Sequence, residues 1–157
     1  MTTISMNVFS QESGLLDSLP TTREGFIKSE PAVINTINWL ENTPFDQEPE
    51  KRKLLSAQLL AWLTNSPTVT VTFDSKLTPS SKKNAGLLII FIGGWVKYSL
   101  QNNYSADAVQ CNLAGLKSML KVYQSGAGIK KEKEYEKLVE LNEKGELEAW
   151  VRKQTGN

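Results

Sequence analysis

The chain has 157 residues, of which 39% are hydrophobic and 22% charged, and its 18 basic side chains nearly balance 17 acidic ones. These values are typical of a single globular domain, argue against wholesale disorder, and give no support for binding to duplex nucleic acid, which needs an excess of positive charge on one face. There is no histidine and only one cysteine, Cys111, which excludes an intrachain disulfide, histidine-dependent catalysis and histidine-ligated metal sites.

The first eleven residues carry no charge and differ from the polar segment that follows. Val8 and Ser10 have the spacing of the small residues before a signal-peptidase cleavage site, although a positively charged start and a full apolar run are missing. Two interpretations stay open. A signal-peptide remnant that ends at about residue 10 would place the protein in the periplasm or outside the cell, whereas an ordinary N-terminus would leave it in the cytoplasm.

The chain as a whole is predicted to divide into an extended lead-in over 1–28, one helical domain over 29–153 and a tail over 154–157. The first helix is expected to begin at Ser29, because serine caps free N–H groups. This start places Pro31 in the first turn, where proline is tolerated. A second helix is predicted from about Gln47 to Thr64, with Asp46 as its cap.

Residues 68–73 (TVTVTF) alternate threonine with apolar side chains, which is the clearest strand signal in the chain. Residues 4–8 (ISMNV) alternate too, but no pairing partner for 68–73 is obvious. We therefore expect a short extended segment that packs on helices with its apolar side inward.

A third helix is predicted over 81–101, and its apolar stretch 87–92 makes it the buried centre of the fold. A buried strand over 87–92 is the alternative, but the apolar pattern continues beyond normal strand length. The adjacent glycines 93 and 94 are explained either by a close approach of another helix or by a kink. A kink would open a pocket beside three residues that we name as candidate ligand or partner contacts: Trp95, Lys97 and Tyr98.

A fourth helix is predicted over 106–124, with Ser105 as its cap and Gly126 at its end. A charged helix over 130–142 and a last short helix after Gly145 follow. The sequence thus predicts a mostly α fold, a compact bundle of five or six helices around a buried central helix with one short extended segment. The alternative is an α+β fold with a small sheet. The apolar run 85–96 is too short to span a membrane.

Three stretches resemble an uncharacterised family of small, mostly helical exported bacterial proteins. They are WLTNSPTVTV at 62–71, FIGGWVKY at 91–98 and GELEAW at 145–150. The resemblance covers about residues 35–153 and implies export. The family carries no assigned activity or binding residues, so the resemblance adds none here.

No catalytic or phosphate-binding motif is recognised, and no cofactor is indicated. Cys111 lacks the histidine that would activate a catalytic thiol. We therefore expect a non-enzymatic protein that acts through contacts with another macromolecule, with an unknown protein as partner. A small-molecule binder or enzyme with a pocket near 93–98 is the alternative. Nucleic-acid binding would require the lysines at 82–83, 97 and 130–133 to converge on one face, and we do not expect it.

Overall fold

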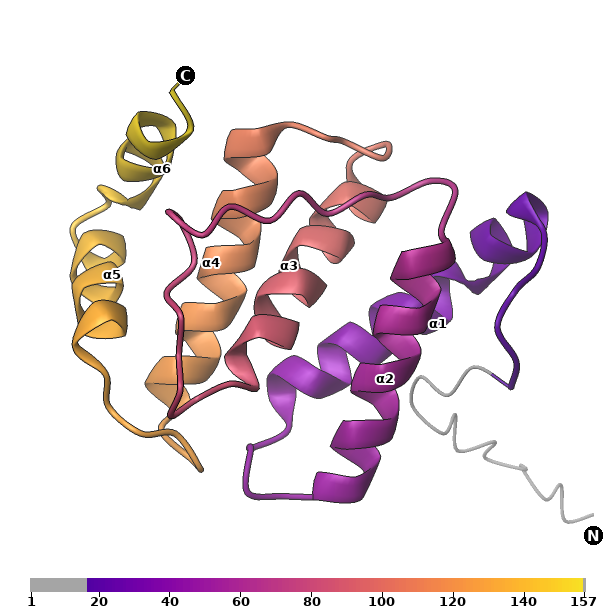
Figure 1. Ribbon diagram of the computed structural model, residues 1–157, viewed down its shortest axis with the longest axis horizontal. Helices are drawn as coiled ribbons and strands as arrows, with labels where there is room; N and C mark the ends of the chain where they lie inside the picture. The colour runs from indigo at the N-terminus through magenta and orange to yellow at the C-terminus, as the bar shows by residue number, and fades with distance from the viewer. Residues whose placement is uncertain (1–16, 157) are drawn as a thin grey trace, which may run out of the picture.

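The computed structural model describes residues 17–156, which form six α-helices (Figure 1). They are α1 Arg23–Asn42, α2 Pro49–Asn65, α3 Leu87–Gln101, α4 Ala108–Ser125, α5 Lys133–Glu143 and α6 Leu147–Thr155. Within these residues there is no β-strand, so the mostly helical prediction is confirmed and the small sheet is absent from this part of the chain. The signal-peptide prediction and the alternating residues 4–8 lie outside the described residues.

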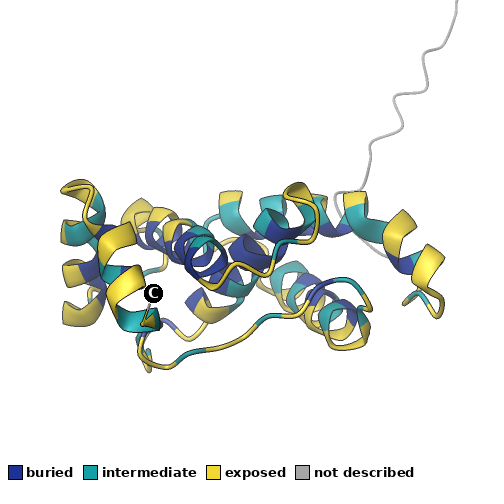
Figure 2. Ribbon diagram, turned by 90° about the horizontal axis from the view of Figure 1, so that it is seen from above, coloured by how far each residue is buried: buried dark blue, intermediate teal, exposed yellow. Residues whose placement is uncertain are grey.

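The antiparallel helices α3 and α4 form the centre, with α1 and α2 on one side and α5 and α6 on the other (Figure 1). Buried residues lie where the helices face one another, while exposed residues lie on their outer faces (Figure 2). The stretch 87–92 lies inside α3, so the buried-strand alternative is wrong. In the described part of the chain, no helix is both long and apolar enough to cross a membrane.

The glycines of α3 and α4 allow these two helices to approach closely. A Cβ atom added to Gly94 would lie 2.8 Å from the carbonyl oxygen of Ala114, and one added to Gly115 would lie 2.7 Å from the Phe91 ring. Neither position has room for a side chain. Gly94 is therefore explained by close helix packing, which is the first of the two interpretations, whereas Gly93 faces the Ile37 side chain of α1 in a looser contact.

The predicted start of α1 is wrong. The helix begins at Arg23 after the N-cap Thr22, so residues 23–28 belong to the helix and not to an extended lead-in. The Ser29 hydroxyl accepts a hydrogen bond from Trp62 Nε1 at 2.8 Å instead of capping a helix. Pro31 consequently lies in the helix interior rather than in the first turn.

The predicted caps of two other helices are also corrected. The N-cap of α2 is Glu48 in a left-handed conformation with φ 46°, and not Asp46. The N-cap of α4 is Asp107 instead of Ser105, because the Asp107 carboxylate accepts the Gln110 N–H, while the Ser105 hydroxyl accepts from the Asp107 N–H. The end of α4 at Gly126, with φ 76°, is as predicted.

A long connection over 66–86 joins α2 to α3 and runs across the α3–α4 pair towards α5 before it returns (Figure 1). Its segment 68–73 follows the predicted pattern in part. Val69 is buried and Val71 is half-buried, but Phe73 is 51% exposed instead of facing inward. The third helix begins at Leu87 rather than at residue 81, because residues 81–86 belong to this connection.

Candidate functional site

The middle of the connection is fixed by a turn at Asp74. The Asp74 carbonyl accepts the backbone N–H groups of Leu77 at 3.0 Å and Thr78 at 3.3 Å, and its carboxylate accepts the N–H of Lys76 at 2.9 Å. Leu77 is only 1% exposed, so it anchors the turn in the core. The turn therefore holds Lys76 and its neighbours at a defined place on the surface.

Asn84 attaches the end of the connection to the segment before α5. Its side-chain amide donates to the Lys130 carbonyl at 2.6 Å and accepts from the Lys130 N–H at 2.8 Å. The same amide group donates to the Glu132 carboxylate, which also accepts from the Ser81 hydroxyl. Because Asn84 is 4% exposed, this junction is shielded from water and binds two distant segments together.

A pair of stacked tyrosines adjoins the junction, because Tyr123 bonds to the Glu132 backbone. The rings of Tyr123 and Tyr135 lie 5.0 Å apart with an interplanar angle of 18°. The Tyr123 hydroxyl donates to the Glu136 carboxylate at 2.8 Å and accepts from the Glu132 N–H at 3.0 Å. Burial raises the pKa of the Tyr135 phenol to about 12, so this group stays neutral at physiological pH.

The connection, α5 and α6 enclose a groove with a volume of about 540 Å³. Its floor is apolar and comes from three segments: Leu77, Pro79, Leu138, Leu141 and Trp150. Its charged lining residues are Lys76, Glu134, Lys137, Glu140 and Lys144. We call this site the α5–α6 groove.

Charge in the α5–α6 groove is distributed unevenly. Lys144 and Glu140 neutralise each other in an ion pair of 2.6 Å. Lys76 and Lys137, by contrast, have no ion-pair partner within residues 17–156, and they face a single unpaired carboxylate, that of Glu134. The unpaired charge of the lining is therefore positive.

A second cavity of about 420 Å³ adjoins the groove and shares Ser75 and Pro79 with it. Its lining includes the exposed apolar side chains of Phe73 and Leu88. Thr78 also lines it, and the buried Thr78 hydroxyl has no hydrogen-bond partner in the described part of the chain. We call this site the Phe73 cavity.

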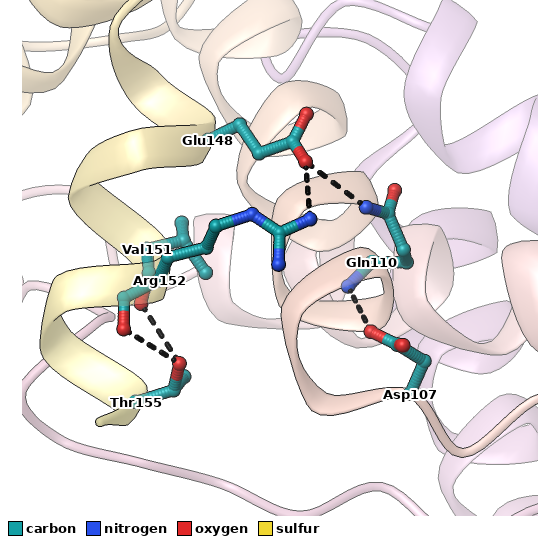
Figure 3. A network of polar contacts seen from close by, with 6 residues as sticks. All are labelled: Asp107, Gln110, Glu148, Val151, Arg152 and Thr155. Atoms are coloured by element: carbon teal, nitrogen blue, oxygen red, sulfur yellow. Dashed lines mark hydrogen bonds and ion pairs between the residues drawn. The ribbon is translucent and has the colours of Figure 1, made fainter. Parts of the chain in front are cut away.

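The helix α6 forms one wall of the groove and is attached to the start of α4 (Figure 3). Glu148 accepts hydrogen bonds from Gln110 at 3.2 Å and from Arg152 at 2.8 Å, while Asp107 caps α4 through the Gln110 N–H. Val151 of α6 is fully buried, and its carbonyl accepts a hydrogen bond from the Thr155 hydroxyl at 3.1 Å. The wall is therefore fixed by packing and by polar contacts.

Five exposed lysines lie on the segments that the Asn84 junction holds together. They are Lys82, Lys83, Lys130, Lys131 and Lys133, and we call them the lysine cluster. The structure thus brings together two of the three lysine groups that nucleic-acid binding would require. The third, Lys97, is engaged elsewhere.

The three sequence-predicted contact residues lie on α3, away from both cavities described above. Trp95 is 2% exposed and Tyr98 is half-buried. Lys97 forms an ion pair of 3.0 Å with Glu41 of α1 and donates to the Asn38 side chain at 3.2 Å. The two contacts of Lys97 join α3 to α1. A ligand or partner role for the three residues stays a prediction.

The single thiol is placed against the core. Cys111 is completely buried, and its Sγ donates to the Ser105 carbonyl at 3.4 Å. Burial, followed by the charge of Asp107, raises the thiol pKa to about 11. Such a thiol is a poor nucleophile at neutral pH. Within residues 17–156, no group of three or more cysteine, aspartate or glutamate side chains is arranged to hold a metal ion.

Comparisons with family models, with curated proteins and with solved structures found no match to this chain. The resemblance to exported helical proteins therefore stays a prediction.

Sequence reasoning missed both the groove and the Phe73 cavity. Leu138 and Trp150 were visible only as apolar positions of two short helices, which is the pattern of ordinary core residues. Phe73 was assigned to an inward face. A usable signal would have been the surplus of apolar positions on the short, highly charged helices α5 and α6.

Proposed function

We propose that the protein is a non-catalytic binding protein that holds a segment of another polypeptide in the α5–α6 groove. The observation that carries this proposal is the apolar floor of the groove, flanked by the unpaired lysines Lys76 and Lys137. Its volume lies within the range of binding sites, which is roughly 300–1,000 Å³. An apolar side chain of the partner fills the floor, and an acidic side chain pairs with a lysine.

A polypeptide fits this surface better than a compact ligand does. The Phe73 cavity adjoins the groove through Ser75 and Pro79, so the concave surface continues on both sides of this short segment. Two adjacent apolar cavities suit side chains that are spaced along a chain. The lysine cluster beyond Asn84 adds positive charge next to the Phe73 cavity, which favours an acidic partner.

The proposal is tested with a display library of random twelve-residue peptides selected on the full chain. We expect enrichment of peptides that combine apolar residues with aspartate or glutamate. The affinity of a selected peptide is then measured by fluorescence anisotropy against Lys137→Glu, a charge reversal in the groove. The matched control is Lys28→Glu, because Lys28 is an exposed lysine of α1 outside the groove.

We expect Lys137→Glu to weaken peptide binding by about tenfold or more. The difference in affinity between this variant and the wild type should shrink at high salt, because the lysine acts through charge. Lys28→Glu should bind as the wild type does. The proposal is contradicted by a library that yields no enrichment. It is equally contradicted by selected peptides that bind the two variants with the same affinity.

The interpretation of the first ten residues as the end of a signal peptide extends this proposal, since it places the binding event outside the cytoplasm. The test is a fusion of the natural gene start, with its upstream sequence, to a reporter that is active only after export. Reporter activity supports export, and an inactive but full-length fusion contradicts it.

A further inference from the structure

The segment Thr70–Phe73 precedes, along the chain, the residues of the connection that line the groove, and its backbone groups have no protein partners among residues 17–156. None of its N–H or C=O groups makes a hydrogen bond to any residue of 17–156. The hydrogen bonds on either side stop at the Val69 N–H and begin again at Asp74. Thr70, Thr72 and Phe73 are exposed and Val71 is half-buried, so we expect water to satisfy these groups in the free protein.

The same segment has the composition and the alternating burial of a strand, although it is not paired in one. Its burial alternates from Val69 to Thr72, buried and half-buried valines against exposed threonines, as in an extended chain. Threonine, valine and phenylalanine favour strands, and the segment contains neither charge nor proline. Val69 belongs to the core and Val71 packs against it, so both valines anchor the segment while its backbone groups stay unpaired.

An unpaired edge of this kind is a template for another extended chain. We propose that the partner polypeptide adds as a β-strand to Thr70–Phe73 and continues into the α5–α6 groove. This inference rests on the proposed function and names how the partner is held. Backbone hydrogen bonds to the segment supply affinity, and side chains in the two cavities supply specificity.

The surroundings of the segment define the chemistry of the partner. At its end, Phe73 is 51% exposed and Leu88 is 42% exposed, so an apolar partner side chain fits the cavity between them. Lys76, Lys82 and Lys83 follow along the connection and have no ion-pair partner among the described residues. The partner strand therefore carries alternating apolar side chains and an acidic end.

The backbone also decides between classes of partner. A nucleic acid or an anionic lipid surface would use the lysine cluster and would leave the amides of 70–73 in water. Only a polypeptide can pair with them in a ladder. A second copy of this chain could pair through the same segment, and that arrangement would appear as a dimer of the free protein.

The test uses a synthetic eight-residue peptide in which valine and threonine alternate, with an aspartate at each end so that either strand direction places a carboxylate near the lysines. Amide hydrogen exchange of the full chain is followed by NMR with and without this peptide, at up to about 1 mM. In the free protein we expect fast exchange at all four amides of 70–73. With peptide, alternate amides should slow by at least about tenfold, because only one edge of a strand pairs with one neighbour.

Two further peptides with unchanged side chains serve as matched controls. One carries N-methyl groups on the odd-numbered residues and the other on the even-numbered residues, so only one of them loses the N–H groups that face the segment. One of them should bind about tenfold or more weakly, because it lacks the donors that face the segment, while the other should bind as the parent does. Unchanged exchange at 70–73, or equal affinities of all three peptides, overturns the inference. Slow exchange at these amides in a dimer of the free protein also overturns it.

The result of this test can be told apart from the result of the groove test. If Lys137→Glu weakens binding but the amides of 70–73 stay unprotected, the groove binds the partner without strand addition. If the amides are protected and Lys137→Glu has no effect, the strand is added but the groove is not used. In the second case the proposed role of the groove has to be revised, whereas strand addition at Thr70–Phe73 remains supported.

Discussion

The close contact between α3 and α4 gives a sharp prediction for Gly94→Ala. The added Cβ atom would lie 2.6 Å from Ser118 Oγ, 2.8 Å from Ser118 Cβ and 2.8 Å from the carbonyl oxygen of Ala114. The Ala114 oxygen belongs to the α4 backbone and cannot turn away. The helices must therefore separate, in the most extensive helix contact of the fold.

Two opposing effects set the magnitude. Alanine in place of glycine favours a helix interior by about 1 kcal/mol. Overpacking of a core costs about 1–3 kcal/mol and more where backbone must move. We expect Gly94→Ala to lower the free energy of unfolding by about 2 kcal/mol net, which shifts the thermal midpoint of a domain of this size down by about 4–8 °C.

The neighbouring glycine is the matched control. A Cβ atom on Gly93 would lie 3.1 Å from the nearest atom, the Cγ2 methyl of Ile37, which is part of a side chain that can adjust. Gly93→Ala is therefore expected to change stability by less than about 1 kcal/mol, because helix propensity offsets the contact. Urea denaturation with a common slope compares the two variants.

A second variant tests the assigned cause. Ser118→Ala removes the Oγ contact but leaves Cβ and the Ala114 oxygen in place, so it should restore only part of the stability that Gly94→Ala loses. Gly94→Ala with a stability equal to or above that of the wild type would refute the reasoning, because propensity alone would then decide. Equal losses in Gly93→Ala and Gly94→Ala would refute it as well.

Three further predictions concern groups with unusual surroundings. The buried Cys111 thiol, with a pKa of about 11, should react with a thiol reagent at pH 8 only as fast as the protein unfolds. Because the folded state holds the thiol proton more tightly than the unfolded state does, the free energy of unfolding should fall as pH rises from about 9 towards 11. Lys97→Met should destabilise the protein by about 1–3 kcal/mol in urea denaturation, because it leaves the 5% exposed Glu41 carboxylate unpaired, and adding Glu41→Gln should recover most of the loss. Pro31→Ala should raise the thermal midpoint, with a gain of up to about 3 kcal/mol, since Pro31 is exposed inside α1, where proline lacks the N–H donor and crowds the preceding turn.

The sequence predicted those elements that local chemistry determines. The apolar length of 87–101 distinguished a central helix from a strand, and Gly126 marked the end of α4 because a left-handed cap needs glycine. Alternation at 68–73 gave an extended segment. In each case the deciding interaction lies within a few residues of the chain.

The start of α1 depended on a distant residue and was therefore missed. Ser29 is a good capping residue by type, but its hydroxyl accepts from Trp62, 33 residues away, and donates to the preceding turn. Thr22 is also a good cap, and nothing near it in the sequence shows which of the two is used. Tertiary contact decided between equal local signals.

The candidate site was hidden for the same reason. The groove combines residues 75–79 with α5 and with Trp150, and these segments are joined through Asn84 and Lys130, which are 46 residues apart. In the sequence, the lysines of α5 alternate with glutamates and predict a solvated face. Only the fold shows which carboxylates are already engaged and which lysines are left unpaired.

The near-neutral total charge conceals a local excess that bears on function. Segments 74–83 and 130–137 carry seven lysines and four carboxylates, and they are packed together at Asn84. Three of those carboxylates accept hydrogen bonds from the protein, those of Asp74, Glu132 and Glu136. The two segments are held together by the contacts of Asn84 and Glu132. The ammonium groups of the surrounding lysines are not among these contacts and repel one another.

Like charges gathered in one place repel and lower stability, but they also steer the association of an oppositely charged partner. The proposed polypeptide partner would supply the missing negative charge. The position of the excess beside the unpaired backbone of 70–73 points to the acidic end of a polypeptide strand. Such binding must weaken as salt rises, because added salt screens the attraction between exposed charges; the screening length is already only about 8–10 Å at physiological ionic strength. Affinity for the aspartate-ended peptide that does not change between low and high salt would remove the lysines from the recognition surface and leave the backbone edge to act without them.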